Sequence, residues 1–219
     1  MKPKILQYAS EFMKNPNIIL TILICFICSS FMSGNPDLKI LFVGNSLTYT
    51  NDLPTLVKEA AENKGINIQV EMIAYPNYAL IDHWQDGKVQ KLILNNKYDL
   101  VIVQQGPSSQ AYGRQLLLEY GKKFSDLCKK NDVEMGYFMV WPSMAYFHTF
   151  DGVIKNYREA AEMHNALLFP AGEVWKAHFD NTGNFDYYGS DKFHPSKKGS
   201  KVAAEVIVEA LSQLKIPAN

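Results

Sequence analysis

Residues 39–46 read KILFVGNS, and this stretch decides how the rest of the chain is interpreted. Its first five residues form a nearly continuous apolar run that ends at a glycine, which is typical of a strand buried on both faces of a sheet. A serine placed directly after such a strand lies on the edge of the sheet where α/β proteins bind ligands. The stretch therefore predicts a buried parallel strand with a hydroxyl group exposed at its carboxyl end.

Downstream of this strand, helix-like and strand-like patterns alternate. Further strands are predicted over residues 66–73, 100–104, 134–140 and 167–169, and helices over 53–64, 88–95, 114–130, 153–164 and about 195–214. Strands separated by helices pair in parallel through right-handed crossovers. We therefore predict one domain, residues 34–219, of class α/β, with three α/β/α layers around a central parallel sheet of about five strands.

The first 33 residues differ from this body. Lys2, Lys4 and Lys14 precede the apolar stretch IILTILICFIC at residues 18–28, and small and polar residues follow it. A basic lead, roughly 7 to 15 apolar residues and small residues behind them form the pattern of a secretory signal. A membrane-spanning helix needs about 20 apolar residues. We expect export, with residues 1–33 acting as a cleaved signal, or as a membrane anchor if they are not cleaved. Lipid attachment at Cys28 is a weaker alternative, because Ile27 stands where a lipobox carries a small residue.

The composition excludes several classes of protein. The 219 residues include 22 Lys+Arg against 22 Asp+Glu and 47% hydrophobic residues, so the chain is neither disordered nor fibrous. A net charge of zero gives no electrostatic support for a nucleic-acid partner. Of the three cysteines only Cys128 lies in the body, where it fits the apolar face of a predicted helix and is expected to be buried.

Sequence motifs for phosphate and metal chemistry are absent. The chain contains neither G-x-x-x-x-G-K-[ST] nor G-x-G-x-x-G, and its five histidines do not form an H-E-x-x-H motif. The Asp- and Asn-rich segment 180–191 has Phe185 where a calcium loop of the EF-hand type needs glycine. We therefore expect no metal and no organic cofactor.

A serine, an acid and a histidine remain as the candidate catalytic set. Ser46 follows the first strand, and Asp191 and His194 stand three residues apart before the last helix. This spacing lets the carboxylate hold one imidazole nitrogen while the other faces a nucleophile, as in a Ser-His-Asp triad. Either half alone is better explained as a turn or a helix cap, but the two together at one edge of the sheet favour catalysis. The G-x-S-x-G elbow of the α/β-hydrolases is not matched, because Thr48 replaces its second glycine.

These residues resemble the sequence blocks of the SGNH hydrolase superfamily, also called GDSL-type esterases and lipases. Residues 42–48 (FVGNSLT) are similar to the block with the nucleophile, and residues 191–196 (DKFHPS), with Gly199 and Ala203, to the block with the acid and the base. The resemblance spans residues 38 to 214. It implies a flavodoxin-like sheet of the SGNH hydrolase type and hydrolysis of acyl esters by Ser46, His194 and Asp191.

The two middle blocks of the family are altered in this chain. Asn77 stands where the family has a glycine whose backbone N–H binds the oxyanion, and asparagine tolerates the left-handed backbone conformation better than most residues. Ser108 stands where the family has an asparagine, so the resemblance leaves Gln105 or Ser108 as the side-chain donor to the oxyanion. Trp141, after the fourth strand, is expected to bind substrate.

The substrate is inferred from export and from aromatic residues near the ligand-binding edge. Such side chains either stack on sugar rings or pack the loops. They are Tyr75, Tyr78, Trp84, Trp141, Tyr187 and Tyr188. Exported members of the superfamily include acetylesterases that act on carbohydrates, so deacetylation of a glycan is the first hypothesis. A lipid esterase or thioesterase is the second, and a catalytically silent glycan-binding module of the same fold is the third.

Overall fold

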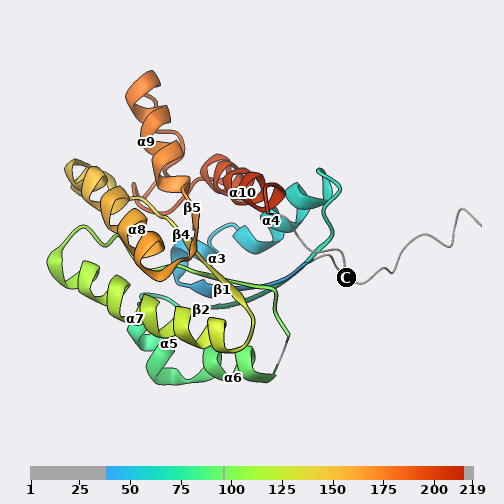
Figure 1. Cartoon of the computed structure of the whole chain (residues 1–219). Helices are drawn as coiled ribbons and strands as arrows, with labels where there is room; N and C mark the ends of the chain where they lie inside the picture. Colours follow the sequence, from blue (N-terminus) through green and yellow to red (C-terminus); the bar gives the residue numbers. More distant parts are fainter. Residues whose placement is uncertain (1–37, 96, 215–219) are drawn as a thin grey trace, which may run out of the picture. The chain divides into compact units, whose positions relative to one another are not determined.

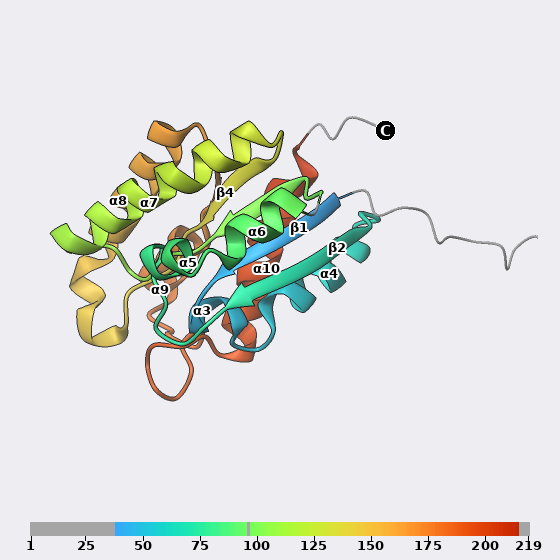
Figure 2. The ribbon, with the colours of Figure 1, turned by 90° about the horizontal axis from the view of Figure 1, so that it is seen from below.

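The computed structural model describes residues 38–95 and 97–214, in which helices surround a five-stranded sheet (Figures 1 and 2). The strands are β1 (Leu38–Gly44), β2 (Ile68–Ala74), β3 (Leu100–Val103), β4 (Glu134–Phe138) and β5 (Leu167–Phe169). Their order is β2-β1-β3-β4-β5, and every neighbouring pair is parallel. This confirms the predicted fold class, and the order is that of flavodoxin-like sheets.

Helices cover both faces of the sheet (Figures 1 and 2). On one face α4 (Leu53–Glu62) packs against α10 (Lys197–Ser212). The other face carries α5 (Leu80–Asp86), α6 (Lys88–Asn95), α7 (Ala111–Lys130) and α8 (Phe150–His164). Helix α9 (Ala171–Thr182) contacts α8 and α10. Two short helices, α3 (Ser46–Tyr49) and the 3₁₀ helix η1 (Met144–Thr149), follow β1 and β4.

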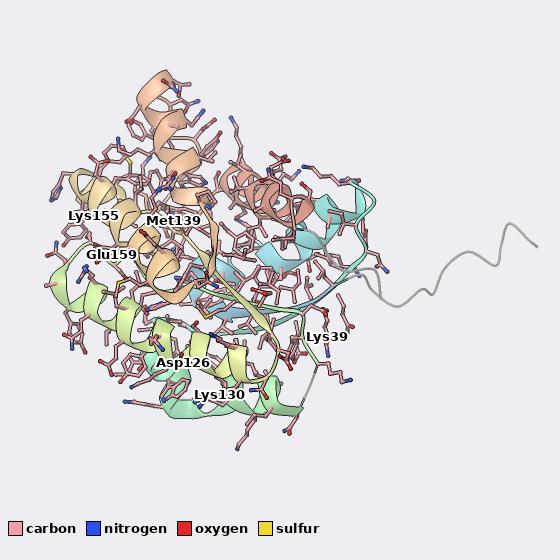
Figure 3. All side chains as sticks on the ribbon, viewed as in Figure 1. Lys39, Asp126, Lys130, Met139, Lys155 and Glu159 are labelled. Carbon is pink, nitrogen blue, oxygen red and sulfur yellow. The ribbon has the colours of Figure 1, made fainter. Side chains whose placement is uncertain are left out.

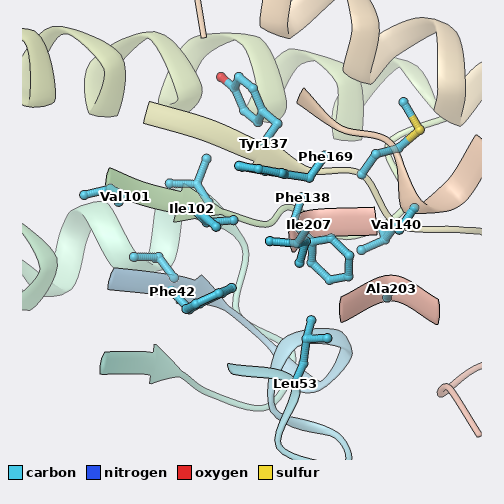
Figure 4. Close-up of a cluster of buried hydrophobic side chains, with 14 of the residues drawn as sticks. Phe42, Leu53, Val101, Ile102, Tyr137, Phe138, Val140, Phe169, Ala203 and Ile207 are labelled. Atoms are coloured by element: carbon cyan, nitrogen blue, oxygen red, sulfur yellow. The ribbon is translucent and has the colours of Figure 1, made fainter. Parts of the chain in front are cut away.

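Strand side chains alternate between the two faces, as the period of two in a β-strand requires. On β4, Tyr137 points toward α7, whereas Phe138 points to the opposite side, where Ala203 and Ile207 of α10 lie (Figure 4). All four side chains are buried. A β-carbon on Gly121 of α7 would lie 1.8 Å from the Tyr137 hydroxyl oxygen, so only a glycine lets α7 approach the strand this closely. The sheet is thus buried on both faces.

Charged residues lie on the outer sides of the helices. Figure 3 shows Asp126 and Lys130 on α7 and Lys155 on α8, and all three are exposed. Lys123 and Glu119 form an ion pair one turn apart on α7, with 2.9 Å between Nζ and Oε1. Exposed pairs of this kind contribute only about 0.3–0.5 kcal/mol each. The stability of the fold therefore comes mainly from its apolar core.

The helical segments α3, α5, η1 and α9 are absent from the sequence prediction. For α9 the signals exist, because Gly183 ends the helix with φ 65° and Ala171, Trp175 and Phe179 repeat every four residues on a buried face. The other three have at most seven residues, too few for a periodic pattern. Strand β4 also ends at Phe138, two residues before the predicted end.

Residues 1–33, which are predicted to be an export signal or a membrane anchor, lie outside the described residues. Among the helices of residues 38–95 and 97–214, none is both long enough and apolar enough to span a membrane.

Candidate active site

Ser46 is positioned by a tight turn between β1 and α3. Asn45 caps α3, and its Oδ1 accepts a hydrogen bond from the backbone N–H of Leu47 at 3.1 Å. Its Nδ2 donates to the carbonyl oxygen of Tyr78 at 2.9 Å. Because both ends of the Asn45 amide are engaged, the turn is fixed, and Ser46 begins the helix with its side chain half-buried.

The side chain of Gln104, which follows β3, holds this turn from the neighbouring strand. Its Oε1 accepts from the backbone N–H of Asn45 at 2.9 Å and from the Thr48 hydroxyl at 3.0 Å, while its Nε2 donates to the carbonyl oxygen of Gln105 at 2.8 Å. Gln104 is only 1% exposed, so water cannot replace these bonds. A β-carbon on Gly44 would lie 2.3 Å from Thr48 Oγ1 and 2.6 Å from Gln104 Oε1. The network therefore requires glycine at position 44.

The candidate acid and base lie in the loop before α10. Asp191 Oδ2 is 2.5 Å from His194 Nδ1, and Asp191 Oδ1 accepts from the backbone N–H groups of Phe193 at 3.0 Å and His194 at 2.9 Å. These bonds, the one to the His194 side chain first, lower the pKa of Asp191. The carboxylate is therefore ionised at neutral pH, and it favours the tautomer of His194 that carries its proton on Nδ1.

The second imidazole nitrogen faces the serine. His194 Nε2 lies 2.8 Å from Ser46 Oγ, although the two residues are 148 positions apart in the chain. With the proton on Nδ1, Nε2 is free to accept the proton of the Ser46 hydroxyl, which is the geometry of a nucleophile and its general base. The three residues predicted to be catalytic, Ser46, Asp191 and His194, thus form one continuous chain of hydrogen bonds.

Trp141 supports the Asp191–His194 loop from behind, so the expectation that it binds substrate is wrong. The residue is fully buried, and its ring stacks on Trp175 with 3.4 Å between centroids and an interplanar angle of 11°. Its indole N–H donates to the carbonyl oxygen of Phe193 at 3.0 Å. A fully buried ring offers no face to a ligand, and its role here is to hold the loop backbone.

Most of the other aromatic residues considered for sugar stacking also pack into the fold. Tyr187 and Tyr188 are 8% and 5% exposed and belong to the core. Trp84 packs edge-on against Phe124 with 5.1 Å between centroids. Tyr75 and Tyr78 are half-buried, and their rings pack against each other with 4.9 Å between centroids.

The three candidate oxyanion donors differ in their surroundings. Asn77 is exposed and has φ 61°, the left-handed conformation that its replacement of a glycine requires. Ser108 is 1% exposed, and its hydroxyl donates to the carbonyl oxygen of Gly106 at 2.8 Å, so its proton is already engaged. Gln105 Oε1 accepts from the backbone N–H of Leu80 at 2.8 Å. Its Nε2 has no partner in the hydrogen bonds found among the described residues, which leaves this amide able to donate.

His83 of α5 stabilises the nucleophile turn, a role for which its sequence context gives no signal. Its Nε2 lies 2.8 Å from the carbonyl oxygen of Gly44, which also accepts from the backbone N–H of Tyr75 at 3.2 Å. The residue is 1% exposed, and burial lowers its pKa. His83 is therefore neutral at physiological pH, with its proton on Nε2, where it donates to Gly44.

A pocket of about 590 Å³ opens beside the Asp191–His194 loop. Its walls come from the segments after β3 and β4, from η1 and from the loop itself. They are formed by Pro107, Ser109, Gln110, Pro142, Ser143, Tyr146, Thr149 and Phe193. Within the described ranges, no group of three or more His, Cys, Asp or Glu residues could hold a metal ion.

Comparison with known proteins gives matches among solved structures only. No family model matches the sequence, and neither does any curated protein. A provisionally named SGNH hydrolase from Slackia heliotrinireducens superposes with a TM-score of 0.66 over 80% of this chain and 98% of its own, at 23% identity. The chain has the SGNH hydrolase fold.

Two further solved structures superpose on this chain. A DUF4886 family protein from Bacteroides uniformis matches with a TM-score of 0.67 and 16% identity, over 83% of this chain and 86% of its own. An acetyl xylan esterase matches with a TM-score of 0.64 and 15% identity, over 79% of this chain and 99% of its own. At these identities the likeness establishes the SGNH fold, and the chemistry has to be argued from the site itself.

Proposed function

We propose that this protein is a serine esterase that removes acetyl groups from carbohydrates. The observation that carries the proposal is the hydrogen-bonded chain from Ser46 through His194 to Asp191, with atoms 2.8 Å and 2.5 Å apart. It lies on the carboxyl edge of a parallel sheet, where α/β proteins bind their ligands. The SGNH fold, shared with an acetyl xylan esterase, agrees with this chemistry.

The proposed reaction proceeds through an acyl-enzyme. Ser46 Oγ attacks the ester carbonyl carbon while His194 Nε2 takes the hydroxyl proton, and the tetrahedral intermediate collapses when His194 returns that proton to the leaving alcohol oxygen. A water molecule, deprotonated by His194, then attacks the acyl-serine. The second tetrahedral intermediate collapses when His194 returns that proton to Ser46 Oγ, which releases acetate and the free serine. Asp191 keeps the imidazole in the required tautomer and stabilises its protonated form.

The oxyanion of the tetrahedral intermediate needs hydrogen-bond donors that are not already engaged. The first N–H groups of a helix have no partner inside it, so the backbone N–H of Ser46 at the start of α3 is one donor. The backbone N–H of Asn77 is the second. For the side-chain donor we choose Gln105 Nε2 over the Ser108 hydroxyl, because that hydroxyl is buried and bonded to Gly106. Each donor of this kind contributes about 2.7–4 kcal/mol to transition-state stabilisation.

Export of the protein is part of this proposal and rests on residues 1–33 alone. A basic lead and a short apolar run form a secretory pattern, and polymeric carbohydrates are met mostly outside the cytoplasm. Sequencing the N-terminus of protein recovered from cell fractions tests it. A mature chain beginning near residue 34 in the exported fraction supports the proposal, and intact protein in the cytoplasm contradicts it.

The esterase proposal is tested by the release of p-nitrophenol from p-nitrophenyl acetate. The purified domain, residues 34–219, is compared with its Ser46→Ala and His194→Ala variants, and circular dichroism verifies that each protein is folded. Wild-type turnover that is lost in both variants supports the proposal. Equal rates in all three folded proteins would overturn it, and a silent binding module would then replace the esterase.

A further inference from the structure

The pocket beside the Asp191–His194 loop lies at the same edge of the sheet as the reacting groups, although Ser46, Asp191 and His194 are not among the residues that line it. Phe193, which lines it, immediately precedes His194, and Pro107 and Ser109 follow Gln105 after β3. Pro142 follows β4, so the pocket and Ser46 share the carboxyl edge of the sheet. A substrate whose ester carbonyl reaches Ser46 can therefore extend its alcohol portion into this pocket.

The walls of the pocket select the chemistry of its ligand. None of the eight residues that line it carries a charge, so a charged group bound there would find no counter-ion to offset its loss of hydration. Ser109, Gln110, Ser143 and Thr149 each bear a hydroxyl or an amide. The Thr149 hydroxyl already donates to the carbonyl oxygen of Tyr146 at 2.8 Å. A fatty acyl chain would offer no hydrogen bond to Ser109, Gln110 or Ser143, which is unfavourable. The lining thus disfavours both an anion and a long acyl chain.

The remaining walls are apolar, and Tyr146 is prominent among them. The residue is 62% exposed, in contrast to the buried Trp141 nearby in sequence. An aromatic face can stack on the C–H face of a sugar ring, whose hydroxyls are then free to bond with side chains at the ring edge. A neutral sugar ring thus satisfies the apolar and the polar walls together.

Tyr146 is presented by a segment that is fixed both to the core and to the catalytic loop. The backbone N–H of Met144, the first residue of η1, donates to the carbonyl oxygen of Lys192 at 2.9 Å. Phe147 packs against Phe150 and Phe185 with centroids 5.4 and 5.5 Å apart. These contacts hold the η1 segment, which carries Tyr146, against both the core and the Asp191–His194 loop.

From these observations we propose that the pocket is a subsite for an uncharged sugar ring of the substrate, with Tyr146 as its stacking platform. The inference rests on the proposed esterase function and narrows its substrate to esters of neutral oligosaccharides. Tyr146, which would determine this specificity, lies outside the hydrogen-bonded chain of Ser46, His194 and Asp191. Tyr146 is accordingly a binding residue and takes no part in proton transfer.

The experiment compares esters with and without a sugar. Values of kcat/KM are measured on acetylated xylo-, cello- and manno-oligosaccharides, on p-nitrophenyl acetate and on p-nitrophenyl octanoate. The Ser46→Ala variant gives the background rate for each substrate. The wild type should turn over at least one acetylated oligosaccharide, and its preference is defined as the ratio of kcat/KM on that ester to kcat/KM on p-nitrophenyl acetate. In Tyr146→Ala this preference should fall about tenfold, mainly through KM, as the loss of one aromatic stacking contact implies. Tyr146→Phe, which keeps the ring, should retain it.

A matched control is Tyr112→Ala, which removes a tyrosine of similar exposure (68%) that does not line the pocket. It should leave the preference unchanged. An unaltered preference in Tyr146→Ala would overturn the proposal, and so would a wild type that hydrolyses p-nitrophenyl acetate but none of the acetylated oligosaccharides. So would a wild-type preference for the octanoate that Tyr146→Ala removes, because the pocket would then bind an acyl chain.

Failure of the esterase proposal is distinguishable from failure of the subsite. If no ester is turned over above the Ser46→Ala blank, calorimetry measures binding of the unacetylated oligosaccharides to Ser46→Ala. Binding that is about tenfold weaker in the Ser46→Ala, Tyr146→Ala double variant would support the subsite without catalysis. Absence of binding to Ser46→Ala, or equal affinity in both proteins, would overturn the subsite as well.

Discussion

Replacing Gly44 by alanine tests how firmly the nucleophile turn is held. The added methyl group would lie 2.3 Å from Thr48 Oγ1 and 2.6 Å from Gln104 Oε1, and separations under 3.0 Å are essentially never seen for a real β-carbon. To restore 3.0 Å, the Thr48 oxygen must retreat by about 0.7 Å and the Gln104 oxygen by about 0.4 Å. If the two oxygens move apart, the distance between Thr48 Oγ1 and Gln104 Oε1 grows from 3.0 Å to about 4.1 Å, which breaks that buried hydrogen bond. The bond from Asn45 N–H to Gln104 Oε1 is lengthened from 2.9 Å and weakened.

The cost follows from those two bonds. A buried donor left without a partner costs about 1–3 kcal/mol, so Gly44→Ala should lose at least this much unfolding free energy, and the weakened bond from Asn45 N–H adds to the loss. Ser46 lies two residues away, and a displacement of about 1 Å at a reacting group can lower the rate about 100-fold. Urea denaturation measures the first effect. The kcat for p-nitrophenyl acetate, taken where the variant is still folded, measures the second.

Gly106→Ala is the matched control for this test. Gly106 follows β3 at the same edge of the sheet, its φ is not left-handed, and an added β-carbon would meet no atom within 4 Å. Alanine there should be neutral or should stabilise by about 0.4–1 kcal/mol, because it restricts the unfolded chain. If Gly44→Ala proves as stable and as active as Gly106→Ala, the reasoning about the turn is refuted.

Three further predictions follow from the surroundings of single side chains. Asp191→Asn should lower kcat by about 10²- to 10⁴-fold. The loss should be smaller than that for a fully buried aspartate, because the Asp191 side chain is 52% exposed. A kcat close to the wild-type value would contradict the role of Asp191. Gln105→Ala should lower kcat by about 10²- to 10³-fold while Ser108→Ala should not, and the reverse order would move the oxyanion donor to Ser108. Burial raises the pKa of Cys128 to about 12, so dithiobis-nitrobenzoate at pH 8 should label it only after denaturation; rapid labelling of Cys128 itself in the folded protein, located by peptide mapping, would contradict its burial.

The predictable parts of the molecule are those encoded by local pattern. An apolar run ending in Gly-Asn-Ser predicts both β1 and the position of Ser46. Asp191 and His194 are three residues apart in one loop, so their pairing as acid and base can also be predicted. The prediction that Cys128 is buried is confirmed by its 1% exposure, because helix α7 has a clear apolar face on which this residue lies.

Other features depend on geometry that the sequence does not encode locally. Strand β4 ends at Phe138, so the alternation of side chains stops there, and nothing in the sequence indicates that Trp141 turns inward onto Trp175. The choice between Gln105 and Ser108 depends on which group already has a partner. Ser108 bonds to Gly106 two residues away, whereas the Gln105 amide is oriented by Leu80, which is distant in sequence. Tyr146 and His83 lie in helices too short for a periodic pattern, so their positions emerge only from the fold.

The central claim is that Ser46, activated by His194, is a nucleophile. Its most direct test is covalent capture by a p-nitrophenyl phosphonate ester, read by intact mass and by peptide mapping. The wild type should gain one phosphonyl group on Ser46, whereas folded Ser46→Ala should gain none and folded His194→Ala should react far more slowly. A folded wild type that remains unmodified, or a His194→Ala variant that reacts at the wild-type rate, would contradict the claim.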